Sequence, residues 1–181
     1  MTGNQSRMFS RLGIVATLCA FASTAGVAQT PGSPRSYAPA EPDRIAIQAV
    51  VDSALAFITN SNAVGLTDLM LPEAQTYSSR QRNGQWAYAM RTRDADRART
   101  PGAQVVERGW APEIRVSGPI AMVWLPYDIY VNNAWSHCGV DVLTMFRVGT
   151  AWRIGNFSYS VEQPPACLPH PNGPPPGMKA P

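Results

Sequence analysis

The sequence has little cysteine, histidine or lysine, and it lacks the local motifs that mark several enzyme classes. Three of its 181 residues are cysteine, two are histidine, and Lys179 is the only lysine. It contains no Gly-x-Ser-x-Gly elbow, no glycine-rich phosphate loop and no dinucleotide fingerprint. These absences argue against the corresponding hydrolases, nucleotide-binding proteins and dehydrogenases. The sequence therefore predicts no cofactor.

Charge is also sparse. Charged residues make up 15% of the chain, and the formal net charge is +3. Removing residues 1–28 would take away Arg7 and Arg11 and leave a net charge of +1. Such a balance lacks the basic footprint that nucleic-acid binding requires, so we expect no nucleic-acid partner.

Residues 1–28 resemble a secretory signal peptide. Arg7 and Arg11 precede an apolar run over residues 12–22, and Gly26 and Ala28 are small residues at the two positions that a signal peptidase reads. We expect cleavage after Ala28 and a periplasmic or secreted protein. An uncleaved anchor is the alternative, but the run is short for about 30 Å of hydrocarbon. No second apolar run could span a membrane.

Export leaves Cys138 and Cys167 as an even pair in an oxidising compartment, which favours one disulfide bond. Zinc is the alternative, because Cys167 and His170 have ligand spacing and His137 adjoins Cys138. Neighbouring residues of a strand point to opposite faces, however, so His137 and Cys138 cannot easily share one ion. We therefore predict the disulfide and no metal site.

Proline, apolar periodicity and turn residues divide the chain into segments. Proline-rich residues 29–42 indicate a disordered linker, and residues 168–181 a disordered tail. Residues 43–60 carry one apolar stripe at helical spacing, which predicts an amphipathic helix. The segments expected between this helix and the last part of the domain are a helix over 64–70, a strand over 73–80, a turn over 82–85, a helix over 86–99, and a strand over 104–116 that Pro112 interrupts.

Residues 119–162 form the part of the sequence around which the rest is organised. β-Branched and aromatic runs alternate with Asn132-Asn133 and Gly149-Thr150, a pattern typical of a three-stranded antiparallel meander. If both dipeptides are tight turns, Asp128 lies opposite His137, Trp124 opposite Asp141, and Asp141 opposite Ser158.

These registers separate the side chains into two faces. The predicted core face carries Val123, Leu125, Tyr127, Ile129, Val140, Val142, Phe146, Phe157, Tyr159 and Val161. The other face is mixed: it carries Trp124, Asp128, Tyr130, Trp135, His137, Asp141, Leu143, Met145, Asn156, Ser158 and Glu162. The mixed face either lines a pocket, where Asp128 could orient His137 and raise its pKa, or is exposed or packed against a second subunit. The residues alone leave both interpretations open.

The element order and several short motifs resemble the nuclear transport factor 2-like superfamily, also described as SnoaL-like or cystatin-like, and within it a bacterial exported branch. The motifs are Glu107-Arg108-Gly109-Trp110, Ala121-Met122-Val123-Trp124, Pro126-Tyr127-Asp128, Ser136-His137-Cys138-Gly139-Val140-Asp141 and Ala151-Trp152-Arg153-Ile154. The resemblance implies an α+β cone over residues 43–167, in which helices pack on a curved antiparallel sheet around a pocket. It also implies a homodimer.

The resemblance implies a choice of functions rather than one function, because relatives include ketosteroid isomerase, polyketide cyclases and proteins that only bind ligands. The leading expectation is a binding site for a small, partly apolar molecule, contacted by Trp124, Asp128, Tyr130, His137 and Asp141. The alternatives are an isomerase, cyclase or dehydratase in which His137, Asp128 or Asp141 is catalytic, and a structural dimerisation module.

Overall fold

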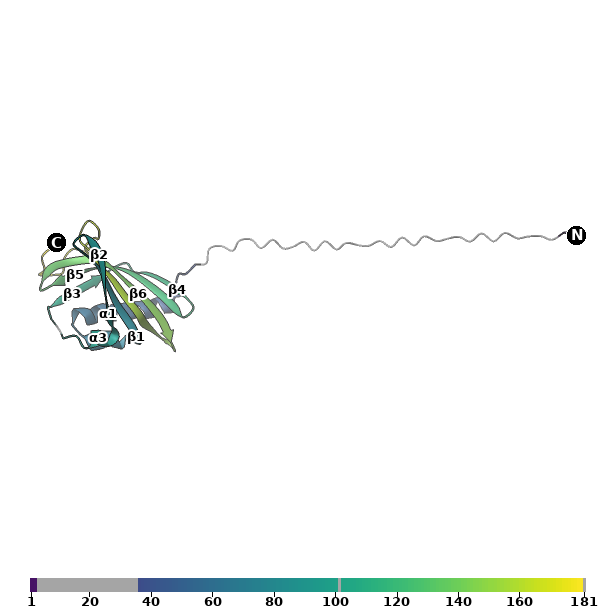
Figure 1. Cartoon of the computed structure of the whole chain (residues 1–181), viewed down its shortest axis with the longest axis horizontal. Helices are drawn as coiled ribbons and strands as arrows, with labels where there is room; N and C mark the ends of the chain where they lie inside the picture. Colours follow the sequence, from purple (N-terminus) through teal and green to yellow (C-terminus); the bar gives the residue numbers. More distant parts are fainter. Residues whose placement is uncertain (3–35, 101, 181) are drawn as a thin grey trace. The chain divides into compact units, whose positions relative to one another are not determined.

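One long helix lies against the concave face of a seven-stranded sheet (Figure 1). The computed structural model describes residues 1–2, 36–100 and 102–180. Ser36–Pro181 forms a unit of its own and is the part described below. The predicted signal peptide lies almost wholly outside the described residues, as does the predicted linker up to residue 35.

The helices precede or interrupt the strands, and three of the four longest strands come last among the elements. The elements in order are α1 (Glu41–Thr59), α2 (Ala63–Asp68), β1 (Met70–Arg82), β2 (Gln85–Thr92), α3 (Arg93–Arg97), β3 (Val105–Gly109), β4 (Glu113–Ser117), β5 (Ile120–Val131), β6 (Ala134–Val148) and β7 (Ala151–Val161). The order of strands across the sheet is β2-β1-β7-β6-β5-β3, and β4 also pairs with β5. All pairs are antiparallel except β1 with β7. The predicted α+β fold class is confirmed.

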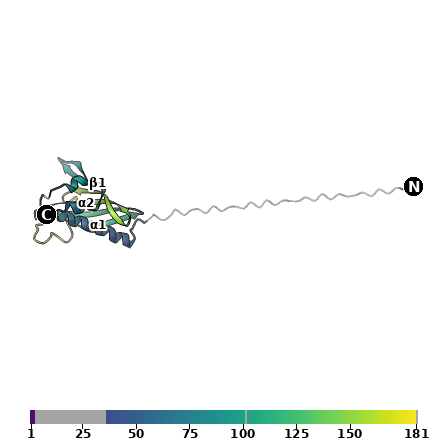
Figure 2. The ribbon, with the colours of Figure 1, turned by 90° about the horizontal axis from the view of Figure 1, so that it is seen from below.

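The core forms where α1 meets the sheet. The apolar stripe of α1 buries Ile47, Val51 and Ala54 against side chains of the inner sheet face, including Val123 and Leu143. Figure 2 shows α1 and α2 along this one side of the sheet. Burying such side chains stabilises the fold by about 1.5–3 kcal/mol each. Within the described part of the chain, no helix has both the length and the apolar character needed to cross a bilayer.

Several local predictions are confirmed. The helix expected over 43–60 is α1, and the second helix is α2, where the Asn62 side chain accepts a hydrogen bond from the Gly65 amide at 2.8 Å. Asn132 and Asn133 both have positive φ values, 51° and 64°, and they join β5 to β6. Gly149, with φ 60°, begins the turn into β7.

The helix predicted over residues 86–99 is wrong. Half of that segment belongs to β2, which pairs with β1, and only Arg93–Arg97 is helical. Asn83 (φ 53°) and Gly84 (φ 76°) form the tight turn of a hairpin, so the chain reverses and the next residues extend the sheet. Trp86 and Tyr88 suit a strand, and the charge pattern that suggested a helix face begins only at Arg91.

The predicted strand registers are also wrong, because each hairpin contains an irregularity. Val131 pairs with Ala134 as predicted, but Tyr130 pairs with Trp135 and Ile129 with His137, which leaves Ser136 as an extra residue in β6. In β7, Gly155 is the extra residue between pairs Met145–Ile154 and Thr144–Asn156. A one-residue shift exchanges the two faces of a strand. Asp128 therefore lies opposite Cys138, Leu125 opposite Asp141, and Asp141 opposite Tyr159.

The outer face of the sheet carries the C-terminal segment. The predicted Cys138–Cys167 disulfide is confirmed, with 5.7 Å between the Cα atoms, so these sulfurs are not zinc ligands. Beyond it, the His170 amide donates to Asp128 at 3.0 Å. The predicted disorder of residues 168–181 therefore does not describe residues 168–180. Arg108 Nη1 also donates to the Gly173 carbonyl oxygen at 2.7 Å, and the His170 ring packs edge-on against Trp110, so hydrogen bonds and one ring contact hold this proline-rich segment.

Gly139 provides a test of the packing between β6 and β7. A Cβ atom at this position would lie 2.3 Å from the Ser160 carbonyl oxygen, which also accepts the Tyr127 hydroxyl at 2.6 Å. We expect Gly139→Ala to lower the free energy of unfolding by about 1–3 kcal/mol, because β7 must move. Urea unfolding measures the change. Gly102→Ala is the control, since no atom lies within 4 Å of its Cβ position; equal stability of the two variants would contradict the packing.

Candidate functional site

A cavity of about 420 Å³ lies between the helices and the inner face of the sheet. Its walls are largely apolar, with Phe57 and Ile58 from the end of α1, Leu66 from α2, and Phe157 from β7. Its size falls in the range of small-molecule sites. Its titratable side chains form two groups: Glu107, Tyr127, His137 and Asp141 on β3, β5 and β6, and Arg80, Arg91, Asp96, Arg99 and Tyr159 on the side of β1, β2 and α3.

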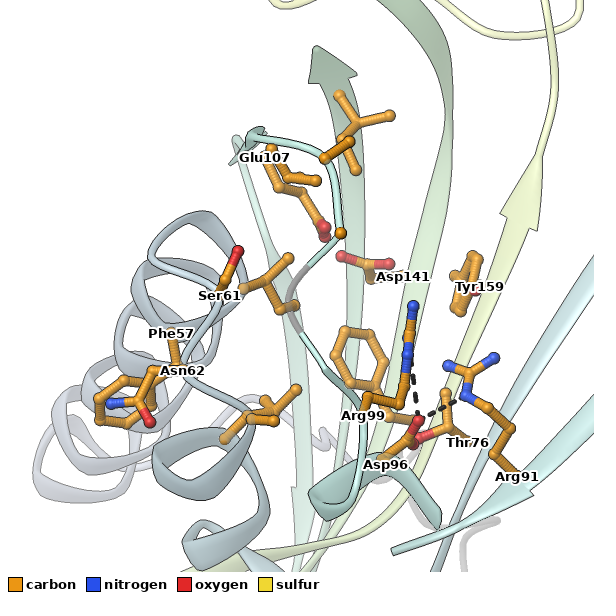
Figure 3. Close-up of a pocket in the computed structure, with 18 of the residues that line it drawn as sticks. Phe57, Ser61, Asn62, Thr76, Arg91, Asp96, Arg99, Glu107, Asp141 and Tyr159 are labelled. Carbon is orange, nitrogen blue, oxygen red and sulfur yellow. Dashed lines mark hydrogen bonds and ion pairs between the residues drawn. The ribbon is translucent and has the colours of Figure 1, made fainter. Parts of the chain in front are cut away.

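Glu107 and Asp141 form a pair of carboxyl groups inside the cavity. Glu107 lies on β3 and Asp141 on β6, and Figure 3 shows the two side chains pointing toward each other. Asp141 is 1% exposed, and the two groups are hydrogen-bonded to each other. Asp141 Oδ2 has no hydrogen-bond partner among the described residues.

Burial controls the protonation of this pair. It raises the pKa of Glu107 from its usual 4.5 to about 7, while the hydrogen bond from Asp141 acts in the opposite direction. Burial, followed by the charge of Glu107, raises the pKa of Asp141 well above its usual range. Two neighbouring carboxylates, one buried and one partly buried, cannot both ionise easily without a cation between them, so near neutral pH they share a proton. The pair can therefore both donate and accept a hydrogen bond.

Tyr127 and His137 adjoin the pair as neutral groups. The Tyr127 hydroxyl donates to the Ser160 carbonyl oxygen, and burial together with the charges of Asp141 and Glu107 raises its pKa. Burial, and secondly the positive charge of Arg80, lowers the pKa of His137 to about 4. The imidazole packs edge-on against Tyr127, with ring centroids 5.9 Å apart, and its Nδ1 lies 2.9 Å from Ser136 Oγ. His137 is thus neutral at neutral pH.

The opposite side of the cavity is rich in arginine. Arg91 Nε donates to Asp96, which also lies 4.0 Å from Arg99 (Figure 3). Asp96 is 6% exposed, and its single carboxylate serves both guanidinium groups. Tyr159 also lines this side of the cavity. The side chain of Arg80, which lies on β1 between β2 and β7, makes neither an ion pair nor a hydrogen bond with any residue that the structure describes.

The structure divides the predicted site residues between two places. His137 and Asp141 line the cavity, whereas Trp124, Asp128 and Tyr130 do not. Trp124 is 45% exposed, and Asp128 is fully buried on the outer face, where it accepts from Arg108 Nε at 2.9 Å and Nη2 at 2.5 Å. The same guanidinium lies over the ring of Tyr130, with 5.4 Å between Arg108 Cζ and the ring centroid.

The hypothesis that Asp128 orients His137 and raises its pKa is therefore wrong. The two residues are on opposite faces of the sheet, and the pKa of His137 is lowered. Sequence reasoning also missed Glu107, Arg80 and Tyr127 as cavity residues. Glu107 carried a weak signal, since it is an acidic residue that directly follows Val105 and Val106, but only the pairing of β3 with β5 places it beside Asp141.

Comparison with known proteins gives matches of fold only. No family model and no curated protein matches the chain. A nuclear transport factor 2-like protein of unknown function from Pseudomonas putida KT2440 superposes with a TM-score of 0.56 at 8% identity, covering 74% of this chain and 96% of that one.

Two structures from Novosphingobium aromaticivorans give similar values. A nuclear transport factor 2-like protein with a cystatin-like fold has a TM-score of 0.54 at 15% identity, covering 66% of this chain and 82% of that chain. A protein named as a candidate scytalone dehydratase has a TM-score of 0.52 at 13% identity, with coverage of 67% and 85%. At such identities the likeness concerns the fold and not the ligand.

The raised pKa of Glu107 predicts how stability depends on pH. The folded protein holds this proton up to about pH 7, whereas the unfolded chain releases it near 4.5, so the stabilisation from protonation is lost as pH rises through that window. We expect Glu107→Gln to reduce the fall in free energy of unfolding between about pH 4 and about pH 8. Urea unfolding at several pH values measures it.

Glu113→Gln, at an exposed position of β4, is the matched control and should retain the pH dependence of the unmodified protein. If Glu107→Gln and Glu113→Gln gave parallel curves, Glu107 would not hold a proton in the folded state.

Proposed function

We propose that this chain, which has the nuclear transport factor 2-like fold, binds a small and mostly apolar molecule in the cavity between α1 and the sheet. The observation that carries the proposal is the pair formed by the buried Asp141 and the partly buried Glu107 inside an otherwise largely apolar space of about 420 Å³. Apolar walls supply affinity for the body of a ligand, and a few buried polar groups fix its orientation.

The carboxyl pair determines which hydrogen bonds the polar group of the ligand must accept or donate. A proton shared by two carboxyl groups can be donated to a ligand carbonyl, and the remaining oxygen can accept from a hydroxyl. Asp141 Oδ2, which lacks a partner among the described residues, supports this role, because buried polar atoms are normally hydrogen-bonded. A ligand with one carbonyl or hydroxyl group on an apolar ring system matches this requirement.

Proton transfer is a second candidate function, as in an isomerase or dehydratase. It is favoured by the pKa of about 7 at Glu107, since an acid–base catalyst works best with a pKa near the working pH. In this mechanism Glu107 and Asp141 take the roles of base and acid. The neutral His137 and the Tyr127 hydroxyl border the same space and orient the reacting group.

Export and dimerisation remain predictions. The disulfide and the absence of a membrane-spanning helix among the described residues are compatible with a periplasmic or secreted protein. For a homodimer, the available surface on the outer face lies around the exposed Trp124, beyond the part that the C-terminal segment covers.

Filling the cavity should abolish ligand binding. Ala63, at the start of α2, lines the cavity, whereas the next residue, Val64, does not and is 48% exposed. We expect Ala63→Trp to weaken binding of the neutral fluorescent dye 1-aminoanthracene by about tenfold or more, and Val64→Trp to leave it unchanged. Fluorescence titration measures both dissociation constants. Equal dye affinity in the two variants would place the dye elsewhere and refute the proposal.

The proton-transfer candidate has its own test, which needs no natural substrate. 2-Tetralone is an apolar ketone with exchangeable α-protons, and their replacement in D₂O can be followed by NMR. We expect the protein to accelerate exchange and Glu107→Gln to lower the rate by about a hundredfold or more, with Glu113→Gln as the unaffected control. Exchange that is as fast in Glu107→Gln would exclude Glu107 as the base.

A further inference from the structure

The cavity holds more positive than negative charge. Three arginines, Arg80, Arg91 and Arg99, line it. Asp96 supplies one full negative charge, and the Glu107–Asp141 pair, while it shares a proton, supplies one more. Three positive charges therefore face two negative ones in a partly enclosed space, where charge is screened less than at the surface.

Arg80 differs from the other two arginines in having no carboxylate beside it among the described residues. Arg91 and Arg99 both approach Asp96, whose single charge balances one of them, and the Arg99 side chain is 64% exposed to solvent. Arg80 lies on β1 in step with Thr76 and Ser78, whose side chains are buried on the inner face, and it is itself partly buried. A partly buried guanidinium without a counter-ion is an energetic cost that an anion could remove.

The neighbourhood of Arg80 also suits an anion. Arg80, His137 and Tyr127 all line the cavity, and the positive charge of Arg80 contributes to the lowered pKa of His137. Tyr159 and Arg91 line the same side of the cavity. An anion here meets a planar guanidinium that can bind a carboxylate through two parallel hydrogen bonds.

Building on the function proposed above, we propose that the ligand is an apolar monocarboxylate whose carboxylate pairs with Arg80. The ring system or chain of the ligand lies between Phe57, Ile58 and Phe157, and its second polar group meets Glu107 and Asp141. The ligand thus has an anionic end and a neutral hydrogen-bonding end. Arg80 fixes its orientation, because the anionic end lies on the arginine side of the cavity.

Two compounds of the same shape test the charge. 2-Naphthoate and 2-naphthamide differ in carrying a carboxylate or a neutral amide, and both are small enough for the cavity. We expect 2-naphthoate to displace 1-aminoanthracene with about tenfold higher affinity than 2-naphthamide near neutral pH, as for one charge-assisted pair. Arg80→Met should reduce this preference to less than about twofold and leave the 2-naphthamide affinity unchanged.

Arg82→Met is the matched control, because Arg82 is an exposed arginine of the same strand that does not line the cavity. It should retain the full preference for 2-naphthoate. Suppose that the dye binds as expected. The anionic subsite is then refuted, and the apolar cavity stands, if 2-naphthoate and 2-naphthamide compete with equal affinity or if neither competes. The same conclusion follows if their difference in affinity persists in Arg80→Met. If Ala63→Trp does not affect dye binding, both proposals fail.

Discussion

The irregular pairing of β6 with β5 decides which polar side chains face α1. Ser136 is an extra residue in β6, so His137 and Asp141 point into the cavity and Cys138 points outward to its disulfide partner. Without this extra residue, alternate side chains of β6 would exchange faces. Asp141 would leave the cavity and the disulfide could not form on the outer side. The pocket and the attachment of the C-terminal segment therefore depend on the same irregularity.

The two faces of the sheet treat buried carboxylates in opposite ways. On the outer face Asp128 is fully buried, but Arg108 and the His170 amide satisfy it, so it is a structural anchor. On the inner face Glu107, the neighbour of Arg108 in sequence, meets Asp141 with no cation between them. A buried carboxylate must find a cation or hold a proton. Asp128 on the outer face pairs with the cation of Arg108, whereas Glu107 and Asp141 on the inner face share a proton. Of these two pairs, the inner one is therefore suited to binding or proton transfer.

Most of the correct predictions depend on interactions between residues close in the chain, and the incorrect ones depend on pairing between distant residues. The helix α1, the turn at Asn132-Asn133 and the Cys138–Cys167 pair depend on a few neighbouring residues or on a count of two cysteines. The helix predicted over residues 86–99 is wrong because it rests on a charge pattern that begins only at Arg91, whereas the turn at Asn83-Gly84 returns the following residues along β1. The proposed partnership of Asp128 and His137 failed because a single extra residue, which no local pattern marks, moved them to opposite faces.

The sequence by itself determined an α+β chain with one amphipathic helix, a long meander and a pair of cysteines that join. These features follow from periodicity, turn residues and composition, which act over a few residues. Only the tertiary structure decided that Glu107 meets Asp141, that Asp128 meets Arg108, and that Arg80 lacks a carboxylate partner among the described residues. The physical reason is that those encounters depend on strand register, and register is set by bulges and by close contacts such as Gly139 against Ser160, between residues distant in the chain.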